Sequence, residues 1–184
     1  MINDIQNNLI KKESIFGPDN YKPLPVVLSR AKGVWAWDVN EKKYLDMMSG
    51  YSAVSHGHAH PELLRVFHEQ SSKLSLTSRA FYTDTLGPYL ETITKISGFE
   101  MCLPMNSGAE AVETAIKSSR RWAYRTKKVK PGKAEIIVAE GNFHGRTTTI
   151  ISFSTDENSR HDFGPHTPGF VTVKYGCAES HEAA

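Results

Sequence analysis

The sequence predicts an α/β fold in which short strands of a mainly parallel sheet alternate with helices. Residues 136–139 form an uninterrupted apolar run, which is typical of a strand covered on both faces. The apolar run at 101–105 is followed by a helical repeat of apolar and small side chains, so residues 101–139 are predicted to form a strand–helix–strand unit. A further strand is expected at residues 170–173.

The elements before this unit follow from turn and helix signals. Residues 33–38 and 43–47 flank a short polar turn, which predicts a β-hairpin in which Asn40 takes a positive φ. Pro61 stands at the first position of an expected helix, a place that favours proline. The apolar spacing predicts a second helix over residues 86–96.

Composition and charge fit an ordinary globular protein. The 184 residues include 22 Lys and Arg and 20 Asp and Glu, so the net charge is +2. The near-balanced charge and the ordinary content of apolar residues, Gly and Pro exclude a disordered tail and a collagen-like repeat. No apolar stretch approaches the ~20 residues that span a bilayer. Without a secretory signal or a disulfide scaffold, the chain is predicted to be cytoplasmic, with Cys102 as a reduced core thiol.

The most informative local feature is the turn at residues 106–110, Asn-Ser-Gly-Ala-Glu, which leads directly into a helix. The first turn of a helix has unpaired N–H groups and partial positive charge, so Ser107 and Gly108 would suit a phosphate. The same turn also fits a simple capping box, with Ser107 as N-cap and Glu110 three residues later. From this turn alone, both interpretations stay open.

A second turn follows the strand at 136–139 and reads Gly-Asn-Phe-His-Gly-Arg-Thr over residues 141–147. Ligands of open α/β sheets bind beyond the carboxyl ends of strands, so we expect this turn and the first to converge on one crevice. Phe143 would stack on a flat ring and Arg146 would pair with a carboxylate, although each alone also fits a core aromatic or a surface ion pair. Together they favour an aromatic phosphorylated cofactor that handles an amino acid.

These two turns resemble the cofactor-binding segments of class III aminotransferases, which are pyridoxal-phosphate enzymes of fold type I. The resemblance runs from about residue 17 to about residue 175. It also includes Trp37-Asp38, Tyr44-Leu45-Asp46, Ser49-Gly50-Tyr51-Ser52-Ala53 and Gly57-His58-Ala59-His60-Pro61. Within the family, the segments at 20–25, 77–82, 103–106 and 163–170 are most similar to members that act on ornithine.

The resemblance implies roles for matching positions. These positions are Ser107, Gly108, Ala109, Phe143, Arg146, Tyr21 and Tyr51. The first three would hold the phosphate of pyridoxal phosphate, Phe143 would stack on its ring, Arg146 would bind the substrate carboxylate, and the two tyrosines would line the ornithine pocket. The implied reaction transfers the δ-amino group of ornithine to 2-oxoglutarate, giving glutamate and glutamate semialdehyde, in a homodimer.

The chain is much shorter than family members, whose Schiff-base lysine lies in a part that has no counterpart here. We therefore assign no catalytic residue and expect this N-terminal portion, a truncated chain, to be inactive alone. It divides into an N-terminal arm and hairpin at 1–60, the first part of the large cofactor-binding domain at 61–175 and an atypical tail at 176–184. An incomplete parallel sheet exposes apolar faces, so the chain is expected to be unstable or to associate.

Two local departures from the family concern backbone conformation. Glu41 stands where the family has a turn glycine, which Asn40 is expected to offset. The β-branched run at 147–151 favours a strand by propensity, but we follow the family and predict a helix there.

Alternative functions stay open. The chain could belong to a class III enzyme for acetylornithine or 4-aminobutyrate, or be a non-catalytic cofactor-binding or interaction remnant. His56, His58 and His60 are two residues apart, so in an extended chain they would share one face and could bind zinc. No Cys or carboxylate completes the set nearby, so no metal is assigned. The basic cluster at 120–133 is predicted to be a solvated helix end, with no nucleic-acid or membrane partner.

Overall fold

The computed structural model describes residues 2–184, with side chains from Asp4 onward. The chain forms two compact units, Met1–Thr83 and Asp84–Ala184, which we describe separately. None of the described helices is long and apolar enough to cross a bilayer.

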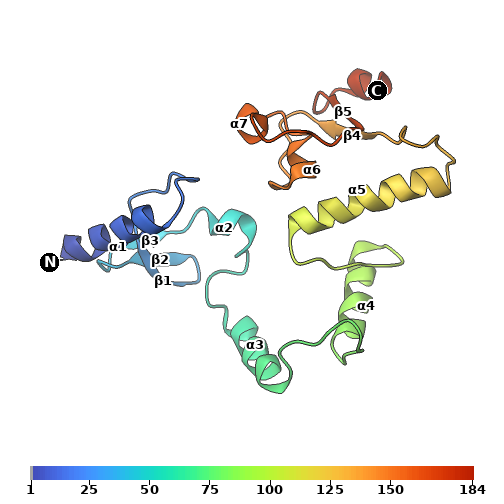
Figure 1. Cartoon of the computed structure of the whole chain (residues 1–184). Helices are drawn as coiled ribbons and strands as arrows, with labels where there is room; N and C mark the ends of the chain where they lie inside the picture. The colour runs from blue at the N-terminus through green and yellow to red at the C-terminus, as the bar shows by residue number, and fades with distance from the viewer. Residues whose placement is uncertain (1) are drawn as a thin grey trace. The chain divides into compact units, whose positions relative to one another are not determined.

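The first unit contains an antiparallel sheet in the order β1-β2-β3 (Figure 1). Its elements are α1 (Ile2–Phe16), β1 (Leu28–Lys32), β2 (Trp35–Asp38), β3 (Lys43–Leu45), α2 (Ser49–Ser52) and α3 (Pro61–Lys73). The predicted hairpin is confirmed as β2 paired with β3, and the predicted helix begins with Pro61 at its first position. Helix α1 was not predicted from the sequence. Its Gln6 side chain donates to Pro25 O (3.1 Å) and accepts from Asn40 Nδ2 (3.0 Å), which joins α1 to the rest of the unit.

The turn between β2 and β3 differs from the prediction at one position. Glu41, and not Asn40, has the positive φ, at 62°. The reason is the Asp38 side chain, which is only 3% exposed and whose Oδ1 accepts the N–H groups of Asn40 (2.8 Å) and Lys42 (2.9 Å). Tyr44 Oη donates to the other carboxylate oxygen at 2.8 Å, so one carboxylate organises the whole turn.

This arrangement makes the hairpin sensitive to acid. Burial raises the pKa of Asp38, but the bonds from Tyr44, Lys42 and Asn40 outweigh it and hold this pKa below its ordinary value. A carboxyl with a lowered folded pKa stabilises the fold above its unfolded pKa, and that contribution is lost as the pH falls through the folded pKa.

We expect the thermal unfolding midpoint of the hairpin to fall as the pH drops below about 4, and Asp38→Asn to flatten this dependence. The near-UV circular dichroism of Trp35 and Trp37 reports on it in a Trp122→Phe background, which removes the third tryptophan. A midpoint with equal acid sensitivity in the parent and Asp38→Asn would contradict the assignment.

The second unit contains two parallel strands and the helices around them. Its elements are α4 (Leu86–Ser97), α5 (Gly108–Arg125), β4 (Ile136–Ala139), α6 (Thr148–Ile151), α7 (Glu157–Arg160), β5 (Phe170–Val173) and α8 (Ala178–Glu182). β4 and β5 pair in parallel from Ile136↔Phe170 to Ala139↔Val173. The β-branched run forms α6, as the resemblance implies, because Thr147 Oγ1 accepts the Ile150 N–H and the apolar side chains of α6 enter the core.

The core of the second unit lies where α6 meets α5 and the two strands (Figure 1). Ile116 of α5 packs with Ile150 and Phe153, and smaller or partly buried side chains surround them. The surrounding residues are Ala109, Val112, Ile136, Val138 and Phe170.

The expected strand at 101–105 does not form, so the predicted strand–helix–strand unit at 101–139 is wrong in its first element. No described strand pairs with this segment, and Met101 is 87% exposed. Cys102 is half-buried rather than a core thiol for the same reason. A segment with strand-like composition forms a β-strand only when a neighbouring strand pairs its backbone N–H and C=O groups, and no described strand does so here.

Large apolar side chains are exposed in both units, among them Leu63, Val66 and Phe67 on α3 and Ile137 on β4. Contiguous exposed apolar surface favours association. Light scattering of the purified chain should therefore show species larger than a monomer, and a monomer with a sharp urea transition would contradict this.

Candidate functional site

The N-terminus of α5 is a capping box. Ser107 Oγ accepts the Glu110 N–H (3.2 Å), while Glu110 Oε2 accepts the N–H groups of Ser107 (3.1 Å) and Asn106 (2.9 Å). The capping interpretation is therefore confirmed. The Ser107 hydroxyl retains its own proton for donation, and a Cβ added at Gly108 would meet nothing within 4 Å. The cap thus leaves a donor and open space for an anion at this helix end.

The second turn packs directly on the first. Gly145 has a φ of 126°, and a Cβ there would come within 2.9 Å of Ala109 Cβ. Thr147 Oγ1 donates to Glu113 Oε1 on α5 at 2.5 Å. Residues 106–110 and 141–147 therefore lie together, as their positions in the fold led us to expect.

Asn142 holds the base of the second turn. Its Nδ2 donates to Ala139 O (2.7 Å) and to Phe153 O (3.1 Å), while its buried Oδ1 has no hydrogen-bond partner among the described residues. Phe143, the next residue, is 72% exposed, and Arg146 is also exposed. Phe143 is therefore not a core aromatic in this chain, and its ring is accessible.

The close contact between Gly145 and Ala109 gives a sharp test of this geometry. Gly145→Ala is expected to destabilise the second unit by roughly 1–3 kcal/mol, because the new methyl group both clashes with Ala109 and strains the backbone. Gly141→Ala is the matched control, since Gly141 also has a positive φ (70°) but faces open space. Urea denaturation measures both variants, and equal losses would contradict the packing role.

The two tyrosines lie in the first unit and contact each other. Tyr21 Oη and Tyr51 Oη are 2.7 Å apart, although the residues are 30 positions apart in the sequence. Both side chains are exposed. The candidate residues therefore form two groups, the tyrosine pair in the first unit and the convergent turns in the second.

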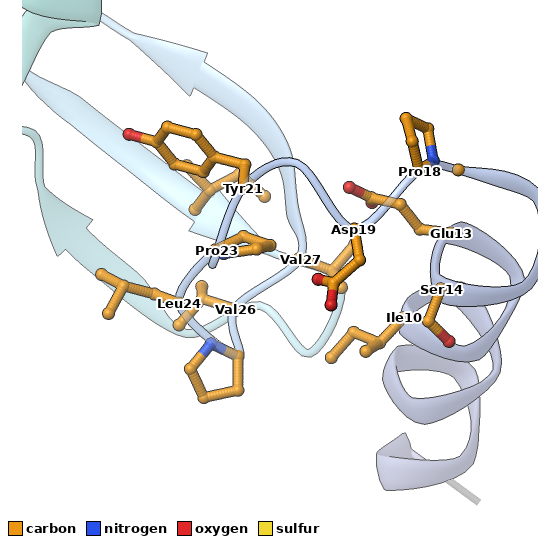
Figure 2. A pocket seen from close by; sticks show the side chains of 13 residues that line it. Ile10, Glu13, Ser14, Pro18, Asp19, Tyr21, Pro23, Leu24, Val26 and Val27 are labelled. Carbon is orange, nitrogen blue, oxygen red and sulfur yellow. The ribbon is translucent and has the colours of Figure 1, made fainter. Parts of the chain in front are cut away.

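Tyr21 also borders a pocket of about 650 Å³ between α1 and residues 17–28 (Figure 2). In Figure 2 the Tyr21 hydroxyl points away from α1. The lining is mostly apolar, with Glu13 and Asp19 as its acidic groups. Neither convergent turn contributes to it, so we do not assign the cofactor there.

Sequence reasoning missed the residues that hold the site together. Glu113 lies one helical turn after Glu110, on the same side of α5, and this spacing was the available signal. Asn142 lies inside a quoted motif, but its role depends on Phe153 O, which only folding brings near. Among the described residues no three metal-ligating side chains gather, and His58 Nε2 is paired with Asp46 Oδ2.

Residues 16–184 match the family model for aminotransferase class-III. The chain belongs to the class III aminotransferases. The predicted family is thereby confirmed, and the match includes the segment 176–184 that the sequence analysis set apart as a tail.

Relatives of this class III aminotransferase include enzymes named for ornithine. It is 55% identical over 174 residues to the ornithine aminotransferase of Brevibacillus brevis and 51% identical over 176 residues to that of Halalkalibacterium halodurans. These alignments cover 95% and 96% of this chain but 44% of each relative. The chain therefore spans less than half the length of these curated relatives.

Solved structures show the same fold. The ornithine aminotransferase of Toxoplasma gondii superposes with a TM-score of 0.95 at 38% identity, over 97% of this chain and 42% of that one. The acetylornithine aminotransferase of Elizabethkingia anophelis gives 0.77 at 54% identity, over 92% of this chain and 41% of that one. The predicted fold class, the N-terminal part of the fold-type-I α/β architecture with an incomplete parallel sheet, is confirmed.

Proposed function

We propose that this chain forms one side of the active site of an ornithine aminotransferase, which transfers the δ-amino group of ornithine to 2-oxoglutarate. The observation that supports the proposal is the packing of residues 141–147, the loop that includes Phe143 and Arg146, on α5, where Gly145 lies against Ala109 and Thr147 bonds Glu113. The ornithine aminotransferases of B. brevis and H. halodurans, both above 50% identity, support this substrate.

The residues present fit pyridoxal phosphate. The first turn of α5 is open at Gly108, Ser107 keeps a hydroxyl proton, and the Phe143 ring is accessible. Ser107, Gly108 and Ala109 would hold the phosphate by N–H and O–H donation at the positive end of α5, and Phe143 would lie against the ring. When bound, the cofactor supplies the electron sink that amino transfer needs.

Each unit carries residues that we assign to substrate binding. The Arg146 guanidinium would form a bidentate pair with a substrate carboxylate, a geometry that suits both amino acids and 2-oxoglutarate. Tyr21 and Tyr51 would line the ornithine pocket with two hydroxyls that already share a hydrogen bond. A homodimer and a cytoplasmic location complete the proposal.

A chimera tests this function. Residues 1–184 replace the matching N-terminal part of the B. brevis ornithine aminotransferase, and amino transfer to 2-oxoglutarate is assayed with ornithine, acetylornithine and 4-aminobutyrate. We expect ornithine to have the highest kcat/KM, with glutamate and glutamate semialdehyde as products. The unaltered B. brevis enzyme is the control.

Acetylornithine is the second candidate substrate, because the E. anophelis acetylornithine aminotransferase is 54% identical to this chain. A chimera that prefers acetylornithine would overturn the ornithine assignment. A folded chimera that does not bind pyridoxal phosphate would instead favour a non-catalytic remnant.

A further inference from the structure

Residues 49–52 form a left-handed turn that presents Tyr51. Ser49, Gly50, Tyr51 and Ser52 have φ values of 50°, 55°, 55° and 70°. For residues with a Cβ this conformation brings the Cβ too close to the following carbonyl oxygen, and it is normally adopted by single Gly, Asn or Asp residues. Three of these four residues carry a Cβ, so contacts from outside the turn must hold it.

Asp46 supplies contacts at the start of the turn, and Ser49 Oγ adds a bond to Val54 O at 3.0 Å. The Asp46 Oδ1 accepts the N–H groups of Met48 (3.0 Å) and Ser49 (2.9 Å), and its Oδ2 lies 2.7 Å from His58 Nε2. The bonds from Ser49 and then from His58 and Met48 hold the pKa of Asp46 below its ordinary value. The carboxylate is therefore ionised near neutral pH, and its hydrogen bonds are charge-assisted.

Both members of the Asp46–His58 pair are themselves bound to the turn between β1 and β2. His58 exchanges two backbone hydrogen bonds with Gly33, each 2.8 Å long, and the Asp46 N–H donates to Val34 O at 2.8 Å. Gly57 makes the approach possible, because a Cβ there would come within 3.1 Å of Gly33 Cα. Through this pair, the left-handed turn is held in a fixed position relative to the residues just before β2.

We propose that Asp46 and His58 are positioning residues, which hold the left-handed turn and thereby set the Tyr51 hydroxyl against Tyr21. The tyrosine contact at 2.7 Å lies within this chain and can be measured without substrate or cofactor. Its consequence for ornithine rests on the proposed function. The two parts can therefore be tested separately.

The first test reads the tyrosine contact without any activity. The 184-residue chain carries 3-fluorotyrosine at position 51, and its ¹⁹F signal is compared in the parent and in Tyr21→Phe, which defines the signal of the broken contact. Asp46→Ala is expected to move the signal to the Tyr21→Phe position, and His58→Ala to move it part of the way. Asp46→Asn should stay near the parent, because an amide oxygen still accepts the N–H groups of Met48 and Ser49.

The matched control is Asp156→Ala. Asp156 also accepts a backbone N–H, from Asn158 (3.1 Å), and also has a lowered pKa, but it lies in the second unit. It should leave the ¹⁹F signal unchanged. An unchanged signal in both Asp46→Ala and His58→Ala would overturn the proposal, and so would loss of the β2–β3 amide signals in both, which would make the pair a general support of the sheet.

The second test uses the chimera and separates the two half-reactions. Asp46→Ala is expected to raise the KM for ornithine about tenfold, the equivalent of one hydrogen bond, while the KM for 2-oxoglutarate stays within about twofold. Equal rises in both KM values would overturn the specific role. A shifted ¹⁹F signal in an inactive chimera would support the positioning role while counting against the proposed function, so the two failures are distinguishable.

Discussion

Phe153→Ala is expected to lower the free energy of unfolding of the second unit by about 3–5 kcal/mol, the largest stability effect we foresee. The Phe153 side chain is 3% exposed and packs with Ile116 and Ile150 in the core. Its ring centroid lies 4.5 Å from that of Phe170 on β5. Truncation removes these contacts and leaves a cavity that short helices and a two-stranded sheet fill poorly.

Urea denaturation followed by far-UV circular dichroism measures this loss. Phe163→Ala is the matched control, because Phe163 is 59% exposed and its truncation should cost about 0.5 kcal/mol or less. Equal losses in the two variants would contradict the placement of the core.

Glu113→Ala is expected to cost roughly 1.5–3 kcal/mol and to release the loop that carries Arg146. Thr147 Oγ1 donates its proton to Glu113 Oε1 at 2.5 Å and accepts the Ile150 N–H at 3.3 Å. The carboxylate therefore fixes which way the threonine hydroxyl points, and the hydroxyl in turn caps α6. Loss of Glu113 removes the first contact and leaves the hydroxyl that accepts the Ile150 N–H without its orienting partner.

A double-mutant cycle with Thr147→Val isolates this interaction. The sum of the stability losses in the two single variants should exceed the loss in the double variant, because either change alone breaks the same hydrogen bond. Glu113→Gln is the conservative variant and should retain part of the stability, since its amide oxygen still accepts the proton. Strictly additive losses would show that Glu113 and Thr147 act independently.

Local signals were sufficient for the helices and strands whose stability is encoded nearby. The spacing of apolar residues predicted α4 and the continuous apolar run predicted β4, because side-chain periodicity reflects which faces are covered. The capping box at Ser107 was also predictable, since its two partners are three residues apart and need only the helix itself. The two turns do lie together, but the first of them follows no strand, and the contacts of Gly145 with Ala109 and of Thr147 with Glu113 are what join them.

Local propensity was misleading where the outcome depended on distant groups. Residues 101–105 have the composition of a strand but find no described strand to pair with. Residues 148–151 favour a strand by their branched side chains, yet form α6 because Thr147 caps it and Ile150 enters the core. Glu41 takes a positive φ because the Asp38 carboxylate holds the amides on either side of it.

The amino-acid sequence by itself determined the family, the α/β class and the positions of the residues around the candidate cofactor site. These depend on motifs, caps and periodicities that extend over a few residues. Only the tertiary structure decided that Glu113 holds Thr147, that Asp46 and His58 hold a left-handed turn, and that Tyr51 meets Tyr21. The Glu113–Thr147, Asp46–His58 and Tyr21–Tyr51 contacts join residues 34, 12 and 30 positions apart, and a hydrogen bond at such a separation exists only after the chain has folded.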